Sequence, residues 1–104
     1  AVKSLLQSGE LPQAIVCASD LIAMGVLRAL RQAKVNVPDD VAVVGYDNIA
    51  VSAYTTPSLT TVQQNTKLAG ELLVNTLLKA INNEDVQDYL MPADIIIRQS
   101  CGSE

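Results

Sequence analysis

The stretch Pro38–Asn48 constrains the fold of this chain most strongly. Its central run, Val41–Val44, is apolar throughout and stops at Gly45, after which an aromatic ring and a carboxylate follow. A short apolar run without polar alternation indicates a strand covered on both faces, as in parallel sheets flanked by helices. In such sheets ligands bind beyond the carboxyl ends of the strands. We therefore expect Tyr46 and Asp47 to offer a small polar ligand a stacking surface and a strong hydrogen-bond acceptor.

The segments before this strand predict a βαβ unit. The apolar run 14–18 is typical of a strand, and the pair Ser19 and Asp20 then supplies capping side chains for a helix that runs to about Lys34. We interpret Asp20 as the N-cap, a structural role. The predicted helix carries a broad apolar face formed by Ile22, Ala23, Val26, Leu27, Leu30 and Ala33. This face should lie flat on a sheet, with a right-handed crossover to the strand 41–44.

The remaining segments alternate in the same way. A helix precedes the first strand and ends at Gly9. A loop over 49–58 leads to an extended segment, 59–62, and then to a second long helix, 66–81, whose wide apolar face two neighbours could share. A polar connection follows, and the last strand, 95–97, consists of three isoleucines and is expected to be buried.

Composition excludes several classes of function. The chain has 104 residues, enough for one domain or a piece of one, and a net charge of −4 with seven scattered Lys and Arg residues, so it carries no basic patch for nucleic acid. It contains no His, no phosphate-binding loop and no paired carboxylates, which disfavours an enzyme, a metal site or a cofactor.

The same composition bears on location. The chain has two distant cysteines, no signal-peptide pattern and no apolar run near the roughly 20 residues that span a membrane. We therefore expect reduced thiols, a cytoplasmic protein and no membrane contact.

Five pieces of the sequence together resemble the LacI/GalR family of sugar-responsive transcriptional repressors. They are AIVCASD at 14–20, AMG at 23–25, VPDDV at 37–41, VGYDNI at 44–49 and PSLTTVQQ at 57–64, and the similarity continues through 95–100. Each piece alone is weak, but their order and spacing together are specific.

The resemblance implies an α/β, parallel-sheet, periplasmic-binding-protein-like (type I) core, of which this chain is the C-terminal portion. It assigns 14–58 to the C-terminal lobe, 59–64 to a crossing between lobes, 65–92 to the N-terminal lobe as a helix and return, and 93–104 to the C-terminal lobe as strand and tail. Such a piece completes neither lobe, so exposed apolar surface should make it self-associate or stay bound to its missing segments. A monodisperse monomer in light scattering would count against that expectation.

The resemblance also implies four residues that contact a sugar-like effector: Asp47, Tyr46, Ser19 and Gln64. Asp47 matches an acid that hydrogen-bonds a sugar hydroxyl and is the residue we favour most for binding; the alternative is an Asp that forms the turn before Asn48. Tyr46 can stack on a sugar or pack under the loop, and Gln64 can bind hydroxyls or be solvated. Ser19 departs from the Asn found in many family members, which leaves the shape of the pocket open.

The resemblance further places Met24, Ile49 and Val51 on a dimer surface, although core packing is the ordinary role of apolar residues. The protein it implies is a homodimer or higher homo-oligomer that binds a sugar or sugar derivative and is not an enzyme. Operator DNA would be bound only through a separate N-terminal helix-turn-helix domain. The alternative is a periplasmic sugar-binding protein of a transport system, which shares the fold; the segment 57–64 and the dimer-like positions favour the repressor.

Overall fold

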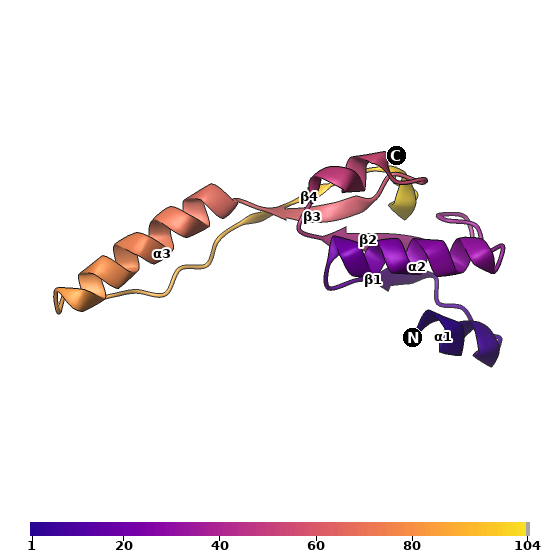
Figure 1. Cartoon of the computed structure of the whole chain (residues 1–104), viewed down its shortest axis with the longest axis horizontal. Helices are drawn as coiled ribbons and strands as arrows, with labels where there is room; N and C mark the ends of the chain where they lie inside the picture. Colours follow the sequence, from indigo (N-terminus) through magenta and orange to yellow (C-terminus); the bar gives the residue numbers. More distant parts are fainter. Residues whose placement is uncertain (104) are drawn as a thin grey trace. The chain divides into compact units, whose positions relative to one another are not determined.

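The computed structural model describes residues 1–103. The helices are α1 (Val2–Ser8), α2 (Asp20–Gln32) and α3 (Thr66–Ile81), and the strands are β1 (Ala14–Val16), β2 (Ala42–Tyr46), β3 (Thr60–Gln64) and β4 (Ala93–Ile96), with short 3₁₀ turns η1 (Ala50–Tyr54) and η2 (Gln99–Cys101) (Figure 1). This order of elements confirms the predicted one. The chain divides into two compact units, the first formed by Ala1–Gln63 together with the residues from Ile95 on, and the second by Gln64–Asp94.

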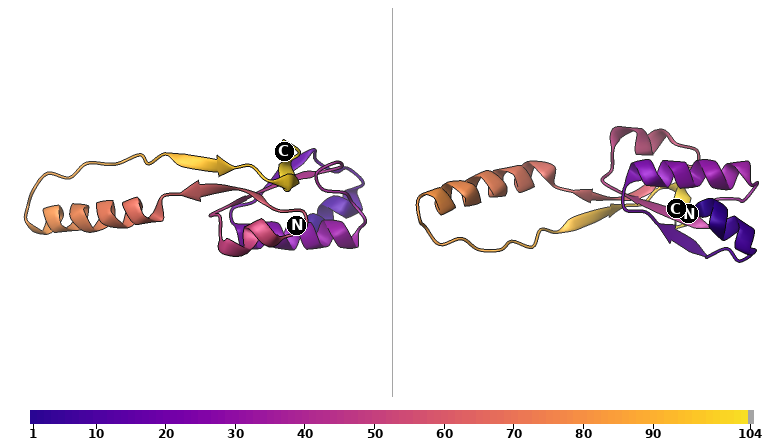
Figure 2. Two further views of the ribbon diagram at one scale, coloured as in Figure 1. Left: turned by 90° about the horizontal axis from the view of Figure 1, so that it is seen from above. Right: turned by 60° about the horizontal axis from the view of Figure 1, so that its bottom comes forward.

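The four strands form one sheet in the order β1-β2-β3-β4. β1, β2 and β3 are parallel, and the register pairs Val16 with Val44 and Tyr46 with Val62. β4 borders β3 and points in the opposite direction (Figure 2). The first two strands and α2 therefore make the predicted βαβ unit within a mostly parallel sheet.

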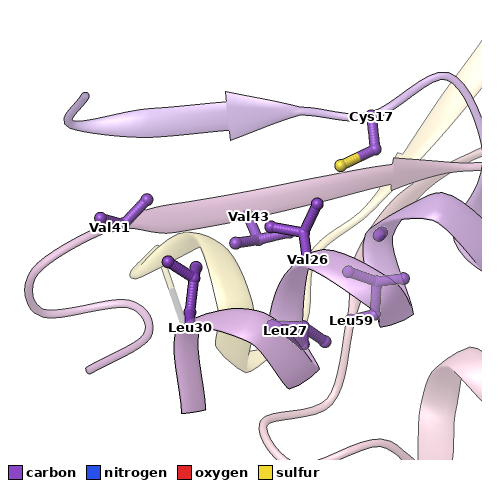
Figure 3. Packing of buried hydrophobic residues seen from close by; sticks show 8 residues of the cluster. Cys17, Val26, Leu27, Leu30, Val41, Val43 and Leu59 are labelled. Atoms are coloured by element: carbon purple, nitrogen blue, oxygen red, sulfur yellow. The ribbon is translucent and has the colours of Figure 1, made fainter. Parts of the chain in front are cut away.

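The hydrophobic core of the first unit lies between α2 and the sheet. Ala23, Val26, Leu27 and Leu30 from α2 pack with Cys17, Val41, Val43 and Leu59, all of them buried (Figure 3). The predicted apolar face of the helix is thus largely confirmed. Its two end members differ, because Ile22 in the first turn and Ala33 beyond the last turn are exposed.

Burial of the strands is less complete than predicted. Along β2 the buried residues Val43 and Gly45 alternate with half-buried neighbours, so only one face of the strand is fully covered. The final isoleucines also differ from the prediction, since Ile95 is 64% exposed and Ile97 lies beyond the end of β4 and is 49% exposed. An apolar triplet predicts a buried strand only where a second layer is present, and the described residues place none over Ile95.

The second unit consists of α3 and the extended segment that follows it (Figure 2). Asn65 caps α3 by accepting a hydrogen bond from the Leu68 backbone N–H at 3.0 Å. No residue of α3 is buried, and Leu73 is 72% exposed. The predicted apolar face therefore exists, but the described residues cover little of it. No helix in the described part of the chain is both long enough and apolar enough to cross a membrane.

Candidate ligand-binding site

The candidate site lies at the carboxyl edge of the parallel strands in the first unit. β1 ends at Val16 and leads to Ser19, while β2 ends at Tyr46 and leads to Asp47. Because the two strands are parallel and Val16 pairs with Val44, both segments leave the sheet at the same edge. The exposed Asp47 carboxylate is therefore presented where open α/β sheets bind ligands.

The backbone turns sharply at Asp47 and Asn48, whose φ angles are 115° and 56°. Both lie in a region that L-residues rarely adopt and that costs on the order of 1–3 kcal/mol. Two hydrogen bonds oppose relaxation, since the Asp47 N–H donates to the Val62 carbonyl at 2.9 Å and the Asn48 N–H donates to Thr61 Oγ1 at 3.2 Å. β3 thus holds the turn that presents the Asp47 carboxylate.

Asp20 is hydrogen-bonded to the residue that follows this turn, Ile49, and its predicted role as the N-cap is wrong. Ser19 is the N-cap of α2: its backbone is extended and its Oγ accepts from the Ile22 N–H at 3.2 Å. Asp20 is instead the first helical residue, where the helix dipole favours negative charge. Its fully buried carboxylate accepts from the Ile49 N–H at 2.8 Å and from Thr61 Oγ1 at 2.6 Å. Asp20 therefore ties α2 to the 47–49 segment and to β3.

Gly45 makes room for that carboxylate. A Cβ added at Gly45 would collide with the Asp20 carboxylate and would lie 2.9 Å from Leu59 Cδ2. The residue that ends the apolar run is thus a glycine because a buried side chain approaches its backbone closely. The sequence marks Gly45 as a stop signal, but nothing in it names Asp20 as the neighbour.

A second set of hydrogen bonds, also missed from the sequence, reaches the same turn from the C-terminal tail. The Arg98 guanidinium donates to Asn48 Oδ1, Ser52 Oγ and the Leu59 carbonyl, each at 2.9 Å. Thr60 Oγ1 accepts from the Arg98 N–H at 2.8 Å, which fixes the start of the tail on β3. These partners lie 38 to 50 residues from Arg98, so no local spacing could have indicated them.

The structure brings three of the four predicted effector residues to this edge. Asp47 is exposed, Tyr46 is the half-buried last residue of β2, and the half-buried Ser19 uses its hydroxyl as a helix cap. Gln64 is the exposed last residue of β3 and belongs to the second unit. Their contacts with an effector stay a prediction.

The three residues predicted for a dimer surface all belong to the first unit. Met24 on α2 and Ile49 beside η1 are half-buried, whereas Val51 within η1 is 47% exposed. None of the three belongs to the buried core cluster. Their role in a dimer stays a prediction.

Both thiols are free and differ in environment. Burial raises the pKa of Cys17, which lies in the core against α2. At Cys101 burial acts in the same direction, but hydrogen bonds from Thr60 and Ser103 outweigh it and hold the pKa below its ordinary value. The two thiols should therefore react at different rates.

Comparison with known proteins identifies the class to which this fold belongs. The family described as periplasmic binding protein-like domain matches residues 1–101. The chain is 37% identical to the HTH-type transcriptional repressor PurR of Glaesserella parasuis, over 96% of this chain and 32% of that protein. It is 40% identical to the ribose operon repressor of Escherichia coli K12, over 95% of this chain and 30% of the relative.

A solved structure agrees with these relatives. The lac repressor dimer bound to operator and the anti-inducer ONPF is 32% identical with a TM-score of 0.88, over 96% of this chain and 35% of that one. The chain therefore belongs to the periplasmic binding protein-like domain family, and within it the predicted LacI-type resemblance is confirmed. It spans about a third of the length of the curated relatives it matches.

Proposed function

We propose that this chain is the ligand-sensing and dimerisation portion of a LacI-type transcriptional repressor that binds a sugar-like effector and performs no catalysis. The observation that carries the proposal is the Asp47 carboxylate, exposed at the carboxyl edge of the sheet on a backbone with positive φ. Strained residues concentrate at ligand sites, and a carboxylate offers two acceptor oxygens to paired hydroxyls. Two of the relatives are named as transcriptional repressors, PurR and the ribose operon repressor, which supports the regulatory role.

The proposal extends to the arrangement of the whole protein. Residues 14–58 and 93–104 would belong to one lobe, 59–64 to a crossing, and 65–92 to the other lobe, with residue 104 outside the described part. Gln64 would face the effector from the crossing. Met24, Ile49 and Val51 would contact a second subunit, and a helix-turn-helix domain outside this chain would bind operator DNA in the cytoplasm. Effector binding would then bias two lobe arrangements of unequal operator affinity.

Calorimetric titration of the intact protein with a panel of sugars tests the effector class. D-ribose comes first, because one relative is the ribose operon repressor, and hexoses, disaccharides and sugar phosphates follow. The proposal expects saturable binding of at least one member. Failure of the entire panel would refute a sugar-like effector.

Substitution of Asp47 tests the site itself. Asp47→Gly is a sharper test than Asp47→Ala, because glycine adopts a φ of 115° without strain, so the backbone turn can persist while the side chain with its carboxylate is lost. Loss of a charged hydrogen-bond acceptor should weaken sugar binding about 10- to 100-fold while operator binding persists. Asp39→Gly, at another exposed aspartate, is the control and should leave affinity unchanged. Unaltered affinity in Asp47→Gly would remove Asp47 from the site.

A further inference from the structure

Arg98 reaches the candidate site through a set of uncharged acceptors. Its Nη2 donates to Asn48 Oδ1, and its Nη1 donates to Ser52 Oγ and to the Leu59 carbonyl, all at 2.9 Å. Hydrogen bonds from a charged donor are shorter and roughly twice as strong as neutral ones. The guanidinium therefore joins the beginning of β3 to the segment 48–52.

Asn48 connects the hydrogen bonds of Arg98 to the strained turn at residues 47 and 48. Besides the bond from Arg98, its Oδ1 accepts from Ser52 Oγ at 3.2 Å, and its Nδ2 donates to Gln63 Oε1 at 3.3 Å. Its backbone has a φ of 56° and follows directly on Asp47. Two consecutive residues in a rarely populated conformation persist only when their surroundings enforce it.

We infer that Arg98 is a positioning residue for the effector site, which sets the direction of the Asp47 carboxylate by holding the side chain of Asn48. The inference rests on the proposed function in assigning Asp47 to the effector. In this role Arg98 does not contact the effector, and it acts on Asp47 through Asn48. The C-terminal tail, 51 residues beyond Asp47, thereby becomes part of the binding site.

Ser100 provides a matched control on the same tail. Its Oγ accepts from the Thr60 N–H at 2.9 Å and donates to the Val43 carbonyl, so it anchors the tail to β2 and β3. None of these bonds reaches residues 47–52. Ser100→Ala should therefore loosen the tail without redirecting Asp47.

Hydrogen exchange of the intact protein, followed by mass spectrometry on peptides covering 46–53, tests the positioning without any ligand. Arg98→Met keeps an unbranched apolar stem and the backbone N–H but removes every guanidinium donor. The amides of Asn48 and Ile49, which donate to Thr61 and Asp20 in the unaltered protein, should then exchange at least about tenfold faster. Ser100→Ala should leave this peptide unchanged. In an Asn48→Gly background, which tolerates the positive φ, Arg98→Met should add little. Unchanged exchange in Arg98→Met, or an equal rise in Ser100→Ala, would overturn the inference.

Titration with D-ribose gives the functional measurement. Arg98→Met should raise the D-ribose Kd about tenfold, Arg98→Lys should recover part of that loss because it restores one charged donor, and Ser100→Ala should have no effect. A Kd unchanged in Arg98→Met would contradict the positioning role. If the unaltered protein does not bind D-ribose, that result counts against ribose as effector, and the exchange experiment alone decides the role of Arg98.

Discussion

Removal of the buried Asp20 carboxylate should destabilise the protein, because two hydrogen-bond donors would lose their acceptor. Asp20 is fully buried and accepts from the Thr61 hydroxyl at 2.6 Å and the Ile49 N–H at 2.8 Å. A buried donor without an acceptor costs about 1–3 kcal/mol. Thr61 is fully buried and bears that cost, whereas the half-buried Ile49 can recover some hydration. We expect Asp20→Ala to lower the free energy of unfolding by about 2–4 kcal/mol.

Asp20→Asn separates hydrogen bonding from charge. The asparagine oxygen can still accept from Ile49, and its NH₂ can donate to Thr61 Oγ1, because a hydroxyl both accepts and donates. Only the acceptor for the Thr61 hydroxyl proton is lost. We therefore expect a loss of about 1 kcal/mol, well below that of Asp20→Ala.

Guanidinium unfolding of the intact protein, followed by circular dichroism at one fixed protein concentration, measures these differences. Asp39→Ala is the control, because Asp39 is exposed and a surface change of this kind stays within about 0.5 kcal/mol. The hydrogen-bonding argument fails if Asp20→Ala has the same free energy of unfolding as this control, or if Asp20→Asn lowers that free energy as much as Asp20→Ala does.

Two further predictions concern the neighbours of this site and the thiols. Gly45→Ala should lower the free energy of unfolding by about 1–3 kcal/mol through overpacking. The loss in the Gly45→Ala, Asp20→Ala double variant should be smaller than the sum of the two single losses, because Asp20→Ala removes the carboxylate with which the new Cβ would collide. Strictly additive losses in unfolding experiments would contradict the close approach of Asp20 to Gly45. Cys101 should react with a maleimide before Cys17, since its pKa is lowered while that of the buried Cys17 is raised. As the pH falls, labelling of Cys101 should persist below the pH at which a free cysteine slows, and peptide mapping that finds Cys17 labelled first would refute this ordering.

The order of elements was predictable because each follows from local periodicity. The apolar face of α2 and the run 41–44 predict helix and strand, and Gly9, with a φ of 75°, ends α1 as expected. The position of Asp47 at the edge of the sheet follows from the same reasoning, since parallel strands share a carboxyl edge. These features depend on neighbours in sequence.

Other features could not be predicted from the sequence, either because they depend on residues far apart in the chain or because two neighbouring residues suit the same role equally well. Ser19 and Asp20 are both good capping residues, and only the structure distinguishes the cap from the buried acceptor. Arg98 meets Asn48 across 50 residues, a separation that carries no periodic signal. Burial of the isoleucine triplet failed as a prediction because an apolar strand has the same sequence whether or not a second layer covers it.

The bonds of Ser100 and Thr60 also close a long loop in the chain. Residues 60 and 100 meet while the segment 64–94 leaves and returns between them as a separate compact unit. The entropy lost in closing such a loop grows only with the logarithm of its length, so even a doubling costs about 0.6 kcal/mol. Insertions or deletions within 82–92, where the chain forms neither helix nor strand, are therefore compatible with an intact first unit. The length of this excursion can therefore vary, while the hydrogen bonds of Arg98 and Ser100 to Ser58 and Thr60 hold the two ends of the loop together.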